Sequence, residues 1–160
     1  MKSLRFLILI AVVLLLTPAV FAADFGFRAG RLDFQEGSGE NFVGAEVLFA
    51  VGPVNVNPNV EYWLLDDNEF GGDVTAGTAN LDLTVDFGSA RVKPYVGAGI
   101  GLSYIDTDFG DNTETIGNLI GGVQFDLDFL KPYGQVKYTR SVENSDDDDG
   151  VWAFTVGLRF

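Results

Sequence analysis

Apolar and polar residues alternate along most of this sequence, and the alternation persists through whole segments. In residues 54–65, valines, a proline, Tyr62 and Leu64 alternate with Asn55, Asn57, Asn59 and Glu61. The same pattern recurs in residues 80–87, 92–104 and 118–127. Because successive side chains of a β-strand point to opposite faces, each segment would have one apolar face and one polar face. The fold must therefore place these two kinds of face in separate environments.

We predict eight β-strands from residue 24 onward, each with at least the roughly 9–11 residues that cross a bilayer at a tilt. Their expected bounds are 24–34, 41–51, 54–65, 74–87, 92–106, 116–127, 132–140 and 151–160. A soluble β-sandwich would hide the apolar faces between two sheets and leave the polar faces in water. A transmembrane β-barrel reverses this arrangement, with apolar faces toward lipid and polar faces toward the lumen.

The connections between the strands distinguish these two architectures. Long connections at residues 35–40, 66–73, 107–115 and 141–150 alternate with short turns at 52–53, 88–91 and 128–131. The long ones contain most of the 23 acidic residues and no basic residue. Outer-membrane barrels have short periplasmic turns and longer external loops. We therefore predict an all-β fold, an eight-stranded up-and-down antiparallel transmembrane β-barrel; a soluble, periplasmic lipocalin-like barrel is the alternative.

The first 22 residues have the layout of a cleaved secretory signal peptide. Lys2 and Arg5 precede an apolar run, Pro18 interrupts it, and small residues stand before the expected cleavage after Ala22. Residues 23–160 would then form one barrel domain. A signal peptide and a transmembrane barrel together predict the outer membrane of a Gram-negative bacterium as the location.

Composition excludes several functional classes. The 23 acidic residues outnumber the 10 basic ones, so a nucleic-acid partner, which needs a basic footprint, is not expected. The sequence has no Cys, and therefore no disulfide framework, and no His, the commonest general base and metal ligand. We expect no cofactor.

The final strand has an apolar and partly aromatic face formed by Trp152, Phe154, Val156, Leu158 and Phe160. In the first strand, Phe25, Phe27 and Ala29 can face lipid, but Arg31 and Asp33 share their parity. Either a bulge near Gly30 exchanges the faces, or the strand has left the hydrocarbon by Arg31.

Two stretches resemble a known family. Residues 93–104, KPYVGAGIGLSY, are similar to a strand of the small OmpA, OmpX and opacity-type outer-membrane barrels. The strand ending at Phe160 resembles the signal that such barrels present to the barrel-assembly machinery, which makes that machinery an expected partner. OmpA-type proteins often continue into a periplasmic domain that binds peptidoglycan, and this sequence contains no residues for it beyond the barrel.

Strand parity directs a set of charged side chains into the lumen. They are Arg28, Glu46, Glu61, Asp82, Asp86, Lys93, Asp126, Lys137 and Arg159. An eight-stranded barrel is just wide enough for side chains to fill, and buried charges must be paired. We expect a plug of ion pairs, with a narrow gated ion pathway as the alternative. Gly97, Gly99 and Gly101 would make room for long neighbours, or else line a small-ligand cavity.

The densest charge is the run Asp146, Asp147, Asp148 and Asp149 in the last long connection. Oxygen ligands suit Ca²⁺ or Mg²⁺, but the run lacks the spacing of an EF-hand. A solvated, repulsive loop is the main expectation. A weak divalent site, or a cation-bridged contact with lipopolysaccharide, is the alternative.

The sequence therefore predicts a small, non-enzymatic, monomeric outer-membrane barrel with a structural or surface-interaction role. A narrow channel or small-solute binder is one alternative. A lipid-modifying enzyme is another, but the sequence has no His to activate Ser103. A Ser–Lys pair with Lys93 or Lys137 is conceivable on residue types alone.

Overall fold

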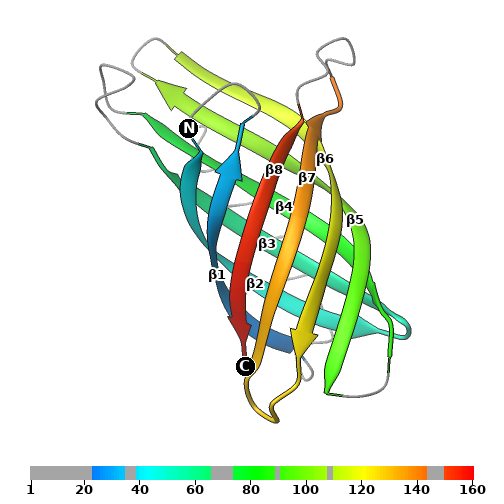
Figure 1. The fold of residues 1–160 in the computed structure, drawn as a ribbon. Helices are drawn as coiled ribbons and strands as arrows, with labels where there is room; N and C mark the ends of the chain where they lie inside the picture. The colour runs from blue at the N-terminus through cyan, green and yellow to red at the C-terminus, as the bar shows by residue number, and fades with distance from the viewer. Residues whose placement is uncertain (1–22, 35–38, 66–73, 89–90, 108–109, 144–149) are drawn as a thin grey trace.

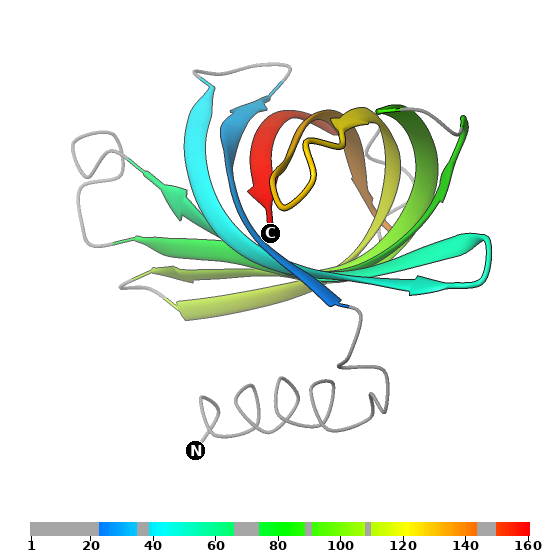
Figure 2. The same ribbon diagram turned by 90° about the horizontal axis from the view of Figure 1, so that it is seen from below.

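The computed structural model describes residues 23–34, 39–65, 74–88, 91–107, 110–143 and 150–160. They form eight strands in a closed antiparallel barrel, each paired with its neighbours in the sequence and β1 paired with β8 (Figures 1 and 2). The strands are β1 (Ala23–Asp33), β2 (Glu40–Val51), β3 (Val54–Leu64), β4 (Thr75–Asp86), β5 (Val92–Thr107), β6 (Gly110–Phe125), β7 (Lys131–Ser141) and β8 (Val151–Arg159). The predicted fold class is therefore confirmed, with strand bounds close to those expected except in β6.

The described chain contains no helix long and apolar enough to cross a membrane. The predicted signal peptide, residues 1–22, lies outside the described residues.

Three short turns and the C-terminus lie at one end of the barrel, which we call the short-turn end (Figure 1). Residues with positive φ reverse the chain there: Gly52 at 62°, Gly88 at 111° and Asp128 at 63°. Glycine adopts such angles without steric cost, and Asp tolerates them better than most residues. The opposite end, where the longer connections begin, is the long-loop end.

Most polar side chains of the strands lie inside the barrel, and most apolar side chains lie on its outer wall. Glu61 and Asn59 are each 4% exposed in the lumen, whereas Phe27 is 66% and Leu119 is 62% exposed on the outer wall. The expected apolar face of β8 also points outward, since Trp152, Phe154, Val156, Leu158 and Phe160 are all exposed. This is the pattern of a transmembrane barrel, in which lipid covers the outer wall.

The first strand contains no bulge. Its register continues without interruption from Ala23 to Leu32 against β2 and from Gly26 to Asp33 against β8. Arg31 and Asp33 both face outward and are exposed near the long-loop end. Of the two explanations offered by the sequence, the structure thus favours a strand that has left the hydrocarbon by Arg31.

The expected loop at residues 107–115 is wrong. Strand β6 begins at Gly110, and its pairing with β5 continues to Thr107↔Gly110. Residues 111–114 are polar on both faces, so an alternation of apolar and polar residues could not mark them as a strand. The β5–β6 hairpin consequently extends past the pairing of β6 with β7, which starts at Ile116.

A small apolar cluster fills the lumen toward the long-loop end. Leu32, Phe42 and Ala153 are 1–4% exposed, and Trp63 packs against them. Phe42 lies over Gly30, where an added Cβ would stand 2.6 Å from its ring. The polar part of the lumen therefore lies between this cluster and the short-turn end.

Candidate functional site in the barrel lumen

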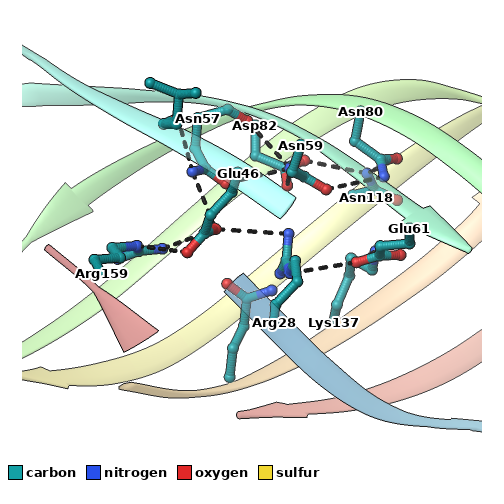
Figure 3. A network of polar contacts seen from close by, with 12 residues as sticks. Arg28, Glu46, Asn57, Asn59, Glu61, Asn80, Asp82, Asn118, Lys137 and Arg159 are labelled. Carbon is teal, nitrogen blue, oxygen red and sulfur yellow. Dashed lines mark hydrogen bonds and ion pairs between the residues drawn. The ribbon is translucent and has the colours of Figure 1, made fainter. Parts of the chain in front are cut away.

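Six of the expected lumen charges lie inside the barrel and are almost fully buried. They are Arg28, Glu46, Glu61, Asp82, Lys137 and Arg159 (Figure 3). They come from β1, β2, β3, β4, β7 and β8, so the network joins strands that are far apart in the sequence. Three are cationic and three are anionic, and the formal charge of this buried set is zero. Such balance is needed because an unpaired buried ion costs several kcal/mol.

Arg159 and Glu46 form the buried ion pair nearest the short-turn end. Arg159 donates from Nε to Glu46 Oε1 at 2.7 Å and from Nη2 to Oε2 at 3.3 Å. Its Nη1 donates to Gln124 at 2.6 Å, and its guanidinium lies 4.0 Å from the centre of the Tyr133 ring. A two-pronged bond of this kind fixes both side chains in orientation.

Glu61 and Lys137 form the second buried pair. The Lys137 ammonium donates to both carboxylate oxygens of Glu61, at 2.7 and 2.8 Å. The hydroxyl of Thr78 donates a further hydrogen bond to Glu61 at 3.1 Å. The Glu61 carboxylate thus receives three hydrogen bonds, and its side chain is only 1% exposed.

Arg28 lies between these two pairs. Its Nη1 is 3.8 Å from Glu46 and its Nε is 3.5 Å from Glu61, with no exposed surface on its side chain. None of its three guanidinium nitrogens donates a hydrogen bond to the described residues. Arg28 therefore balances the charge of the two glutamates without a directed bond, and it is the most weakly held member of the network.

A chain of amide side chains crosses the other side of the lumen (Figure 3). Asn57 donates to Glu46 at 3.1 Å, Asn59 to Asn57 at 3.2 Å, and Asn80 to Asn59 at 3.1 Å. Asn118 continues the chain by donating to Asn80 at 2.9 Å. The hydroxyl of Thr139 closes it with a bond to Asn118 at 2.9 Å. Hydrogen bonds link side chains from β2 to β7 in this way.

The carboxylate of Asp82 is held by amides from that chain. Asn59 donates to it at 2.8 Å and Asn118 at 3.1 Å. Asp82 is 1% exposed. Neutral donors thus hold a buried anion, with the cations of the network as its more distant counter-charges.

The glycines of β5 make this arrangement possible. Gly99 pairs with both Asp82 and Asn118, so these two side chains meet across a strand that has no side chain in between. An added Cβ at Gly99 would overlap the Asp82 carboxylate, and one at Gly101 would overlap the Asn80 amide. Gly99 and Gly101 therefore make room for neighbouring side chains, as expected, and these side chains are Asp82 and Asn80.

The other expected site residues lie elsewhere. Lys93 pairs with Asp126 at 2.9 Å at the short-turn end, where both are partly exposed, and this bond lowers the pKa of Asp126. Asp86 is exposed at the end of β4, outside the network, because the strand has there reached the mouth of the barrel. The aspartates 146–149 lie outside the described residues. No cluster of potential metal ligands occurs among the residues that the structure describes.

Sequence reasoning missed two parts of the site. One is the amide chain, although the alternating Asn55, Asn57 and Asn59 signalled an amide-lined face. The other is the pair between Lys131 and Asp24, whose closest atoms are 2.6 Å apart at the short-turn end. Only the closure of β1 on the β7–β8 hairpin brings these two residues together.

Comparison with solved structures finds outer-membrane barrels. Neisserial surface protein A matches with a TM-score of 0.67 and 14% identity, over 86% of this chain and 94% of that one. The N-terminal β-barrel domain of Pseudomonas aeruginosa OprF matches with 0.62 and 15%, over 86% and 97%. The outer membrane enzyme PagL matches with 0.53 and 12%, over 86% and 98%. No protein-family model and no curated sequence matches the chain. At these identities the matches establish a shared fold, which agrees with the predicted family and location.

Proposed function

We propose that this chain, which has the fold of the small eight-stranded outer-membrane β-barrels, is a closed, non-enzymatic protein of the Gram-negative outer membrane with a structural or surface-interaction role. Its long-loop end is external and its short-turn end is periplasmic, in line with the loop lengths of such barrels. Its partners are the lipids around the wall and the molecules that meet the acidic external loops.

The filled lumen is the observation that carries this proposal. The side chains of Lys137 and Glu61 are 1–2% exposed, and those of Arg28 and Glu46 are fully covered. An open aqueous path through the lumen would leave these charged side chains exposed to water, and hydration would stabilise their ionised forms without a protein partner. Ion pairs and amides occupy that path, and the network supports a barrel that separates the two sides of a membrane.

The same contacts argue against catalysis. Of the two lysines that could activate Ser103, Lys137 is bonded to Glu61 and Lys93 to Asp126. A nucleophile needs an adjacent base, and both candidate bases are paired with carboxylates. The likeness to an outer membrane enzyme concerns the fold alone. Lipid A mass spectra that stay unchanged on deletion and on overexpression of the protein would support this part of the proposal; a new lipid species would refute it.

A narrow ion channel is the second candidate, and Arg28 favours it. Because its guanidinium makes no hydrogen bond within the described residues, a modest movement could separate it from Glu46 and Glu61. Single-channel recording in planar bilayers distinguishes the two functions. We expect no conductance steps from the wild type or from Arg91→Gln, an exposed control, and discrete steps from Lys137→Ala. Regular conductance steps from the wild type would establish the channel instead.

A further inference from the structure

The basic side chains are distributed unevenly over the barrel. Of those in residues 23–160, three fill the lumen and three lie at the short-turn end: Arg28, Lys137 and Arg159, and then Arg91, Lys93 and Lys131. The other two, Arg31 and Arg140, lie within the last three residues of β1 and β7 at the long-loop end. Both have the parity of the outer wall, opposite to that of the buried Arg28 and Lys137. The external half of this wall thus presents two outward arginines.

Aromatic side chains occupy the wall between the two arginines. Arg31 pairs across β1 and β8 with Phe154, and Trp152 pairs across β8 and β7 with Tyr138. The rings of Tyr138 and Trp152 lie 4.9 Å apart, and Trp152 is 45% exposed. Tyr and Trp favour the boundary between lipid headgroups and acyl chains. Arg140 lies two residues beyond Tyr138 toward the long-loop end, and Arg31 lies two residues before Asp33, which pairs with Trp152. Both arginines are therefore close to this aromatic pair, which marks the headgroup boundary.

A shallow groove of about 650 Å³ lies on the same wall, on strands β6, β7 and β8, nearer the middle of the barrel. It is lined mainly by outward residues: Gly121, Val123, Gly134, Val136, Phe154 and Val156. An added Cβ at Gly121 or Gly134 would meet no atom within 4 Å. The packing of the wall itself therefore does not require glycine at either position, although glycine weakens a strand.

We propose that this wall, formed by β6, β7, β8 and β1, binds a phosphorylated glycolipid of the outer leaflet, the lipid A part of lipopolysaccharide. Arg31 and Arg140 donate hydrogen bonds to its phosphates, and the glycine groove holds an acyl chain below Tyr138 and Trp152. Arginine suits phosphate because its planar donors can bind two oxygens at once. The positive charges of Arg31 and Arg140 are complementary to the negative charges of the lipid A phosphates. The proposal rests on the proposed outer-membrane location and orientation.

Native mass spectrometry of the refolded barrel tests this binding. The barrel is mixed with lipid A, with dephosphorylated lipid A and with phosphatidylglycerol, and retention of each is titrated. We expect lipid A to bind in preference to both. Replacement of either arginine, Arg31→Gln or Arg140→Gln, should weaken lipid A binding about tenfold, which is the scale of one charge-assisted hydrogen bond. Arg91→Gln, at the short-turn end, should leave binding unchanged.

The groove and the exposed Asp33 of β1 provide further variants. Gly134→Leu should fill the groove and weaken lipid A binding, whereas Ala98→Leu, on the outer face of β5, should not. Asp33 faces outward beside Trp152, so Asp33→Asn should strengthen binding by removing repulsion of phosphate. Each variant is first shown to fold by its heat-dependent shift on a gel.

Three results would overturn the proposal: equal retention of phosphatidylglycerol and lipid A, full lipid A binding by the folded double variant Arg31→Gln/Arg140→Gln, or a dimer of barrels in place of the lipid complex. Fractionation of the wild type away from the outer membrane would instead refute the proposed function, and it is measured before any lipid is added.

Discussion

The contact of Asp82 and Asn118 across the bare backbone of Gly99 allows a sharp test of the lumen network. A methyl group added by Gly99→Ala would overlap the Asp82 carboxylate and force it away from its two amide donors. Gly121→Ala is the matched control on the outer wall, where the new methyl group meets no atom within 4 Å.

The expected magnitude follows from the bonds that are lost. Each hydrogen bond to a charged group contributes about 1.5–3 kcal/mol, and Asp82 accepts two. Alanine is better than glycine in a strand by about 0.5–1 kcal/mol, and both variants gain this amount. Gly99→Ala should therefore lower the free energy of unfolding by about 2–5 kcal/mol. Gly121→Ala should raise it by about 0.5–1 kcal/mol.

Urea unfolding of the barrel in phospholipid vesicles measures both values, with the fluorescence of Trp63 and Trp152 as the signal. A large gap between the two variants would support the close contact across β5. If the free energies of unfolding of the two variants agreed within about 0.5 kcal/mol, the size of an ordinary surface effect, the glycine would not be needed to seat Asp82, and the reasoning would fail.

Three further predictions concern the charges and the last residue. Glu61→Gln removes the partner of Lys137 and should lower the free energy of unfolding by about 3–5 kcal/mol in the same assay, because it leaves buried cations uncompensated; a loss below about 1 kcal/mol, the scale of surface pairs, would contradict this. The pKa of Asp126 is lowered by Lys93, so its stabilising effect exists above the ordinary carboxyl pKa and disappears as the pH falls through the lowered one. Wild type and Asp126→Asn should accordingly differ in stability at neutral pH and converge in strong acid; a difference that persists in acid would refute the assignment. Phe160→Ala should reduce the amount of barrel in the outer membrane of cells while leaving refolding into detergent unchanged, and equal reduction in both would assign Phe160 to stability instead.

The sequence predicted the architecture because one rule, the two-residue period of a strand, applies to every segment at once. Parity directed Glu61 and Arg159 inward and Phe154 outward without any knowledge of which strands touch. The same rule could not locate the start of β6, where residues 111–114 are polar on both faces. The same rule also could not explain why Arg31 shares the outward parity of Phe25 and Phe27. A bulge and the end of the membrane-spanning part of the strand would produce the same sequence pattern.

Partners inside the lumen were beyond sequence reasoning for a different reason. Arg159 meets Glu46 across 113 positions, and Lys137 meets Glu61 across 76. Such pairs depend on strand tilt and on the stagger of the closed barrel, which no local pattern encodes. The sequence predicted that Gly99 makes room for other side chains, but it could not identify them, because they come from β4 and β6.

Closure of β1 on β8 also sets an order in time. The strand that begins at Ala23 pairs with the strand that ends at Arg159, so the seam forms only after nearly the whole chain has arrived. Such non-local pairing makes folding slow. Until the seam forms, Glu46 and Arg159 cannot form their ion pair, and water can hydrate both charges. The charged groups that fill the lumen of the folded barrel thus favour hydration of the unfolded chain. They favour a chain that remains unfolded until the last strand reaches the membrane.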